Sequence, residues 1–173
     1  EGAHQKLNAA VAIKAVNSLL EDFPLTNTMI SEGVKKANII ARFEKINIGD
    51  KTVILDVAHN PAAVERLIET LQEKPMETVA IFSALADKDI AEMIQLASSA
   101  IKHWFLVPIS SERSIKVESL KNKFDKPEST TICLDMKSAI TQSLELNSVK
   151  RIVIFGSFYT IADASKIIKN SNH

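Results

Sequence analysis

Glycine is scarce in this chain, and the spacing of its few glycines excludes the two commonest phosphate-binding loops. Four glycines occur among 173 residues, at Gly2, Gly33, Gly49 and Gly156. A P-loop needs the spacing GxxxxGK followed by Ser or Thr, and a dinucleotide-binding loop needs GxGxxG, because closely spaced glycines let backbone N–H groups wrap around phosphates. Neither motif is present. If this chain handles a nucleotide, it does so without the part that usually grips the phosphates.

Cysteine is used once, at Cys133 in the apolar stretch TTICLDM. A single cysteine forms neither an internal disulfide nor a CxxC metal site, which fits a reducing compartment such as the cytoplasm. The apolar neighbours favour a buried strand thiol over the alternative, a nucleophile.

Neither sign of charge is in excess. Lys and Arg number 21, Asp and Glu also number 21, and hydrophobic residues make up 46% of the chain. Without a basic surplus to neutralise a phosphate backbone, a nucleic-acid partner is not expected. No apolar run approaches the roughly 18 residues that span a bilayer, and no signal peptide opens the chain. We therefore expect a soluble cytoplasmic protein without a membrane partner. Because the first residue is Glu1, we expect a processed chain or a piece of a longer one.

Apolar runs alternate with helical patterns along most of the chain. Five runs each precede a helical pattern: 53–58 before 61–73, 78–84 before 89–101, 104–109 before 116–123, 130–135 before 136–147, and 151–157 before a helix ending near residue 170. Near-continuous apolar strands separated by helices are typical of parallel sheets covered on both faces. A turn at Gly49-Asp50 adds a hairpin arm before the first run. The sequence therefore predicts an α/β fold, with a Rossmann-like, mostly parallel sheet, an antiparallel edge strand and helices on both faces.

The first 37 residues follow a different pattern. Residues 4–20 are rich in Ala and Leu, lack Pro and Gly, and predict a mostly buried helix. Thr28 is a candidate N-cap for a short helix over 29–37. His4 and Asn8 are four residues apart, so they share one face of the first helix.

Ligands of such sheets bind beyond the carboxyl ends of the strands, so the residues just after each strand are the functional candidates. Asp56 ends an apolar strand, where a carboxylate must be solvated or paired. His59 is a candidate hydrogen-bond partner for it, which leaves a structural pair and a functional site as equal alternatives. Asn60-Pro61 is explained by helix capping, worth about 1 kcal/mol, and this role does not exclude function.

The other strand ends also have simple structural interpretations. Asp87 and Asp89 are candidate caps for the next helix, Lys88 is a candidate solvated lysine, and Arg113 lies in a loop of serines as a candidate surface arginine. The segment GSFYT, residues 156–160, places a small flexible pair and a hydroxyl at another strand end, a pattern found more often in loops than in sites. None of these residues decides the function alone.

Taken together and in order, however, these segments resemble a known family. The stretches GAHQKLNAAVAIKA, ARFE, ILDVAHNPAA, SALADKD and IFGSFYTIADA are similar to the C-terminal part of bacterial folylpolyglutamate synthase / dihydrofolate synthase, of the ATP-dependent Mur ligase superfamily. LDVAHNP is the most specific element. The resemblance implies that residues 1–37 are the end of a central ATPase domain with its linker and that residues 38–173 are a C-terminal Mur-ligase-type domain.

The chemistry implied by this resemblance is amide ligation. ATP phosphorylates the carboxylate of dihydropteroate or folate, and the amino group of glutamate attacks the resulting acyl phosphate. The implied partners are therefore ATP, glutamate, the pterin-bearing acid and the missing N-terminal domain of the same chain. Mg²⁺ is implied as well. Its ligands, like the P-loop and the carbamylated lysine of the family, are expected upstream, so no metal ligand is assigned here. The isolated piece is expected to be inactive.

The resemblance also carries roles to individual residues. Asn8, Arg42 and Asp56 resemble nucleotide-binding residues, with Arg42 on the ATP phosphates and Asp56 on the ribose. His59 resembles a motif histidine needed for activity, and Ser157 a serine on the glutamate side. These two are the catalytic candidates. The roles suit the chemistry, because an arginine clamps phosphate with paired hydrogen bonds and a carboxylate at a strand end accepts ribose hydroxyls.

One departure and two rivals accompany this assignment. The family usually has Trp-Pro-Gly before the arginine, whereas Ile39, Ile40 and Ala41 precede Arg42 here, which predicts a less sharply turned loop. The nearest rival is another Mur-type amide ligase, such as one of peptidoglycan synthesis. The other is a stand-alone Rossmann-like binding domain, which would need a complete ligand site within this chain.

Overall fold

The computed structural model describes residues 3–19, 24–37 and 40–171, and the chain divides into two compact units, Glu1–Ile40 and Ala41–His173. The first unit contains helices α1 (Ala3–Leu19) and α2 (Asn27–Lys36). The assignment of residues 1–37 to a neighbouring domain stays a prediction.

Two expectations for the first unit are wrong. Helix α1 forms as predicted but is not mostly buried, since Leu7 is 67% and Leu19 82% exposed. Its Ala-rich sequence supplies helix propensity, whereas burial also needs an apolar surface to pack against. Thr26, and not Thr28, caps α2: its side chain accepts from the Met29 backbone N–H at 3.2 Å. The helix begins earlier than predicted because Thr26 has the extended backbone of an N-cap.

The second unit is built on a six-stranded sheet in the order β1-β2-β6-β3-β4-β5. The strands are β1 (Glu44–Ile48), β2 (Lys51–Leu55), β3 (Thr78–Phe82), β4 (His103–Leu106), β5 (Thr130–Ile132) and β6 (Arg151–Phe155). Only the β1–β2 pair is antiparallel, joined by a turn in which Gly49 has φ +60°. The predicted mostly parallel sheet with an antiparallel edge strand is confirmed.

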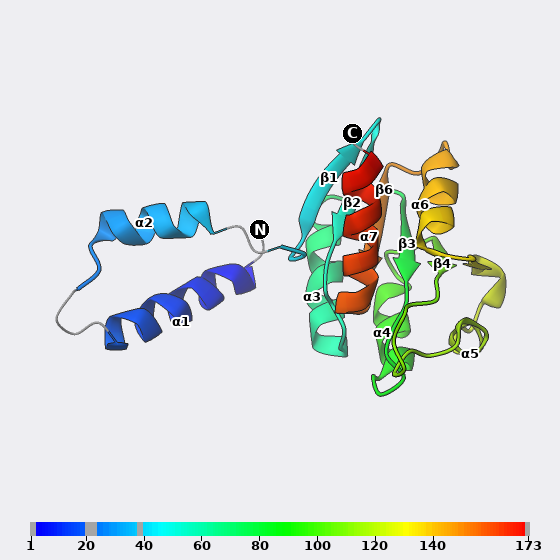
Figure 1. Cartoon of the computed structure of the whole chain (residues 1–173), viewed down its shortest axis with the longest axis horizontal. Helices are drawn as coiled ribbons and strands as arrows, with labels where there is room; N and C mark the ends of the chain where they lie inside the picture. Colours follow the sequence, from blue (N-terminus) through cyan, green and yellow to red (C-terminus); the bar gives the residue numbers. More distant parts are fainter. Residues whose placement is uncertain (1–2, 20–23, 38–39, 172–173) are drawn as a thin grey trace. The chain divides into compact units, whose positions relative to one another are not determined.

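Helices cover both faces of this sheet (Figure 1). One face packs against α3 (Pro61–Gln72), α4 (Ile90–Ala97) and α5 (Val117–Lys121), and the other against α6 (Met136–Glu145) and α7 (Phe158–Ser171). A short 3-10 helix at Pro127–Ser129 precedes β5. The alternation of side chains along a strand makes this possible. In β2, Ile54 joins the core under α3 and α4, while Val53 and Leu55 join the core under α6 and α7.

The order of the strands creates a topological switch point at the carboxyl edge. Strand β6 pairs in parallel with β2 on one side and β3 on the other. The helices that follow β2 and β3 lie on one face, whereas α7, which follows β6, lies on the opposite face. Adjacent chain segments therefore leave the sheet in opposite directions on both sides of β6. Such topological switch points are where doubly wound sheets bind ligands.

Two buried cations hold the opposite, amino edge. Lys51 is 6% exposed, and its Nζ donates to the carbonyl oxygens of Leu146 and Val149 at 2.7 and 2.8 Å. Arg151, also 6% exposed, donates to the Lys74 carbonyl oxygen at 3.0 Å, and burial lowers its pKa from the ordinary value. Leu146 caps the C-terminus of α6 and Lys74 follows α3. Both cations thus bind carbonyl groups at or just beyond the end of a helix, where the regular helical hydrogen bonds stop.

Gly156, just after β6, is the position where the fold most clearly requires glycine. Its φ is +115°, and a Cβ added there would overlap the Ser83 carbonyl oxygen and the Phe82 ring. The close approach brings the start of α7 against the end of β3. Gly49 also has a positive φ, but nothing lies within 4 Å of an added Cβ.

We predict that Gly156→Ala lowers the free energy of unfolding by about 3 kcal/mol or more, because strain and overlap add. Gly49→Ala is the matched control, with a loss of about 1–2 kcal/mol from backbone strain alone. Urea unfolding followed by circular dichroism measures both variants. Equal losses would show that the approach of α7 to Ser83 carries no special constraint.

Candidate functional site

Asp56 joins two segments at the carboxyl edge of the sheet. It directly follows β2 and is half-buried. Its Oδ2 accepts from the backbone N–H of Phe43 at 2.8 Å, and its Oδ1 accepts from that of Ala58, also at 2.8 Å. The Ala41 carbonyl oxygen accepts from the Val57 N–H at 2.9 Å. The carboxylate thus fixes its own loop and the segment before β1 at the same time.

Arg42 lies in the middle of that second segment. Ala41 and Phe43 on either side have φ of 59° and 53°, values that non-glycine residues rarely adopt. The prediction of a less sharply turned loop is therefore wrong. Ala41 takes the left-handed conformation in place of glycine because hydrogen bonds hold it on both sides: its N–H donates to Glu44 Oε2 at 2.9 Å and its carbonyl binds Val57. Exposed Arg42 is presented from a fixed backbone.

His59 and Asn60 complete the turn from β2 into α3. Asn60 accepts from the Ala63 N–H at 2.9 Å and Pro61 opens the helix, so the predicted N-cap is confirmed. The His59 Nδ1 lies 2.8 Å from the Val57 carbonyl oxygen, and its ring contacts that of Phe158, 5.8 Å between centroids. The second contact connects the end of β2 with the start of α7.

Ser157 occupies the turn between β6 and α7. It is 2% exposed. Its Oγ accepts from the Thr160 N–H at 3.0 Å and lies 2.7 Å from the Thr160 hydroxyl oxygen. These contacts give Ser157 a structural role at the first turn of α7 and explain how the neighbouring Phe158, 62% exposed, is held at the edge of the sheet. Its predicted catalytic role stays a prediction.

The structure therefore brings four of the five predicted site residues to one edge of one sheet. They are Arg42, Asp56, His59 and Ser157, on the loops at the carboxyl ends of the adjacent strands β2 and β6 and on the segment that Asp56 holds. Asn8 belongs to the other unit, where its side chain is exposed on α1. Its predicted contact with a nucleotide stays a prediction.

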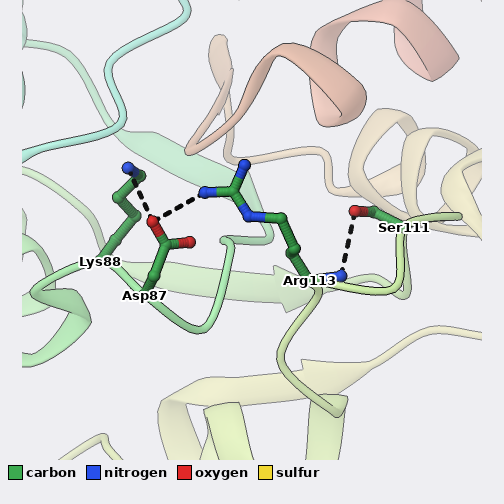
Figure 2. A network of polar contacts seen from close by, with 4 residues as sticks. All are labelled: Asp87, Lys88, Ser111 and Arg113. Carbon is green, nitrogen blue, oxygen red and sulfur yellow. Dashed lines mark hydrogen bonds and ion pairs between the residues drawn. The ribbon is translucent and has the colours of Figure 1, made fainter.

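A second polar group on this edge was not recognised as a unit from the sequence. Asp87, after β3, contacts Lys88 and also Arg113, which follows β4 (Figure 2). Asp89 caps α4 as predicted, accepting from the Glu92 N–H at 3.2 Å, whereas Asp87 does not share that role. Arg113 is exposed, as expected of a surface arginine, but it is paired. The sequence contained one indication of this pairing: Asp87 and Arg113 each lie in a loop that follows a strand, and the two strands are consecutive in the chain.

Other observations on the described residues concern metal binding, membrane-spanning helices, Cys133 and a hollow in the surface. No group of three His, Cys, Asp or Glu side chains able to hold a metal ion occurs among them, and no helix there is long and apolar enough to cross a membrane. The predicted burial of Cys133 is confirmed at 3% exposure, and this burial raises the pKa of its thiol, which favours the unreactive protonated form. A hollow of about 560 Å³ lies at the amino edge around His103, away from the predicted residues.

An α/β domain whose sheet has a topological switch point, with a carboxylate, a histidine and an arginine at the carboxyl ends of its strands, belongs to the class of doubly wound folds, which bind their ligands at such a place. The family follows from comparison. Residues 41–158 match the family model described as Mur ligase, glutamate ligase domain. This match covers more than half of the chain, and the chain belongs to this family.

Several similar proteins and structures carry the name folylpolyglutamate synthase, alone or together with a second activity. A dihydrofolate synthase/folylpolyglutamate synthase from Buchnera aphidicola is 27% identical over 90% of this chain and 41% of its own length. The structure of Escherichia coli FolC in complex with DHPP and ADP superimposes with a TM-score of 0.85 at 25% identity, covering 96% of this chain and 39% of that one. A bifunctional folylpolyglutamate synthase/dihydrofolate synthase with Mn, AMPPNP and L-glutamate bound has a TM-score of 0.76 at 27% identity, covering 85% and 36%. The chain thus spans well under half the length of these relatives.

We predict that Asp56→Ala lowers the free energy of unfolding by about 2 kcal/mol or more, because two part-buried N–H groups lose a charged acceptor. Amide hydrogen exchange at Phe43 and Ala58 should accelerate together. Asp135→Ala is the matched control: it removes the N-cap of α6, costs about 1 kcal/mol and leaves exchange at Phe43 unchanged. Normal protection of Phe43 in Asp56→Ala would contradict the anchoring role.

Proposed function

We propose that this chain is the C-terminal part of an ATP-dependent ligase that joins glutamate to dihydropteroate or folate through an acyl phosphate. The observation that carries the proposal is the Asp56 carboxylate, half-buried at a switch point and bonded to the segment that presents Arg42. An acceptor for hydroxyl groups and a cation at the carboxyl ends of the strands suit a nucleoside with phosphates. The ligands bound in the similar structures, ADP, AMPPNP, DHPP and L-glutamate, support the same substrates.

In this proposal each residue acts on one part of the reaction. Asp56 accepts hydrogen bonds from the ribose hydroxyls, the role that a carboxylate at a strand end has in other nucleotide-binding folds. Arg42 binds the phosphates and stabilises the charge that develops as the γ-phosphoryl group moves to the substrate carboxylate. The amine of glutamate then attacks the acyl carbon, an amide bond forms, and inorganic phosphate leaves. Ser157 serves the glutamate side of the site, and His59 is the motif histidine that the activity requires.

The metal requirement of this chemistry falls outside the described part of this chain. A divalent ion that accompanies ATP would be held by carboxylates and hydroxyls, and no group of three His, Cys, Asp or Glu side chains able to hold one occurs among the described residues. We therefore assign the metal ligands, together with the phosphate loop, to a preceding domain. The chain contributes the nucleotide and acceptor side of a site that the other domain completes.

We predict that the isolated 173-residue chain shows no glutamate-dependent ADP release from ATP. It lacks a glycine-rich phosphate loop, and its described residues include no metal-binding group. The full-length protein, assayed with dihydropteroate or folate and glutamate, should release ADP and form the amide. Isothermal titration of the isolated chain with ATP is the companion measurement. Turnover or tight ATP binding by the chain alone would support a self-contained binding domain over a shared site.

The contact between Asp56 and the ribose is tested in the full-length enzyme by removing a ribose hydroxyl from ATP and by replacing the carboxylate of Asp56. We predict that 2′-deoxy- or 3′-deoxy-ATP lowers kcat/KM about tenfold in the wild type, the cost of one lost charged hydrogen bond. In Asp56→Asn the same deoxy substitution should have a smaller effect, because the contact is already weakened. An equal loss of kcat/KM in both enzymes would show that Asp56 does not contact the ribose. Circular dichroism of Asp56→Asn controls for loss of fold.

A further inference from the structure

Three buried residues that carry hydroxyl groups meet where the start of α7 lies against the end of β3. Ser83 follows β3, Ser157 precedes α7, and Thr160 belongs to the first turn of that helix. Ser83 and Thr160 are 0% exposed and Ser157 is 2% exposed. Gly156 permits this close approach, because an added Cβ there would overlap the Ser83 carbonyl oxygen.

Two of the hydroxyl groups and one carbonyl group form a directed chain of hydrogen bonds. The Thr160 hydroxyl donates to the Ser83 carbonyl oxygen at 3.4 Å. A hydroxyl has a single proton, so Ser157 is the donor in the 2.7 Å contact between the Ser157 and Thr160 hydroxyl oxygens. In this arrangement the Ser157 proton is directed at buried Thr160 and is not offered to a ligand.

The position of the Ser157 hydroxyl is fixed by a further bond. Its Oγ accepts from the Thr160 backbone N–H at 3.0 Å, which is how a side chain caps the start of a helix. Ser157 therefore stays in place while α7 is capped. Any contact with a ligand uses what the cap leaves, which is the proton and one further lone pair of the hydroxyl.

The two hydrogen bonds of the Thr160 hydroxyl differ in length. Its 2.7 Å contact with Ser157 has the ordinary length for two hydroxyl groups, whereas 3.4 Å to the Ser83 carbonyl oxygen exceeds that length. The bond to Ser83 is therefore weak, and Thr160 loses little when its proton turns to Ser157 instead. In this second arrangement Thr160 donates to Ser157, and the Ser157 proton becomes available to an acceptor on a ligand.

We propose that Thr160 is a positioning residue for Ser157: its hydroxyl accepts the Ser157 proton in the free enzyme and donates to Ser157 once the incoming amino acid is bound. This inference rests on the proposed function, in which Ser157 serves the glutamate side of the site. Thr160 itself is buried and contacts no ligand. The exchange breaks one weak bond and leaves each hydroxyl proton with an acceptor, so Ser157 serves the ligand while it still caps α7.

The experiment uses the full-length enzyme and measures glutamate-dependent ADP release. Thr160→Val removes the hydroxyl but keeps the shape of the side chain and the N–H that Ser157 caps. Because one hydrogen bond to Ser157 is lost, the KM for glutamate should rise about fivefold, with kcat and the KM for ATP changed less than about twofold. Thr160→Ser keeps a hydroxyl and should restore the wild-type glutamate KM.

A matched control makes the same substitution at the amino edge. The Thr130 side chain is 7% exposed, and its hydroxyl donates to the Pro127 carbonyl oxygen at 2.6 Å. Thr130→Val should leave the glutamate KM unchanged, because this hydroxyl lies away from Ser157. Should Thr160→Val fail to fold, Thr160→Cys takes its place, since a thiol has nearly the shape of the serine hydroxyl but is a weak donor.

A double-mutant cycle shows whether Thr160 acts through Ser157. Ser157→Ala should raise the glutamate KM, and Thr160→Val added to it should raise that KM less than about twofold further. An unchanged glutamate KM in Thr160→Val, or effects that multiply in the double variant, would overturn the positioning role. A wild-type enzyme that forms no amide from glutamate with dihydropteroate or folate would instead overturn the proposed function.

Discussion

A single carboxylate sets the geometry of the candidate site. Asp56 extends a strand of the central sheet, yet its two oxygens bind the N–H groups of Phe43 and Ala58, which are 13 and two residues away in the chain. The segment carrying Arg42 has a left-handed residue on each side of the arginine, Ala41 and Phe43, a conformation that persists only where surrounding bonds enforce it. Asp56 supplies this enforcement at Phe43, and the bonds of Ala41 to Glu44 and Val57 supply the rest. The carboxylate positions the cation by binding backbone N–H groups, so the arginine side chain stays exposed.

The cations at the amino edge and at the carboxyl edge of the sheet have different roles. At the amino edge, Lys51 and Arg151 are buried and bind the carbonyl groups of helix ends. At the carboxyl edge the cations Arg42 and Arg113 are exposed and are held by anchored backbone and by pairing with Asp87. A cation whose donors are consumed by carbonyl oxygens contributes to stability, whereas one with spare donors is available to a ligand. The second kind lies at the carboxyl ends of the strands, where doubly wound sheets bind their ligands.

The sequence was sufficient to predict the fold and most of the residues at the carboxyl edge of the sheet. Apolar runs, the Gly49 turn and the Asn60-Pro61 cap are local signals with few alternative interpretations. The sequence failed where the outcome depends on distant partners. The exposure of α1 depends on what packs against it, and the left-handed turn at Ala41 depends on bonds to Glu44 and Val57. The pairing of Asp87 with Arg113 joins residues 26 apart, on loops that only the assembled sheet brings together.

The position of β6 has a consequence for how this domain is made. The strand that pairs with both β2 and β3 is the last of the six in the chain. During synthesis the hairpin and the β3–β4–β5 ribbon therefore emerge as separate pieces, each with an open strand edge that invites wrong pairing. The carbonyl oxygens that Lys51 binds are also synthesised late, because Leu146 and Val149 lie 95 and 98 residues further along the chain. A chain that ends before residue 151 has the β1–β2 hairpin and the β3–β4–β5 strands but lacks β6, the strand that joins them. The six-stranded sheet therefore forms only after β6 has been synthesised.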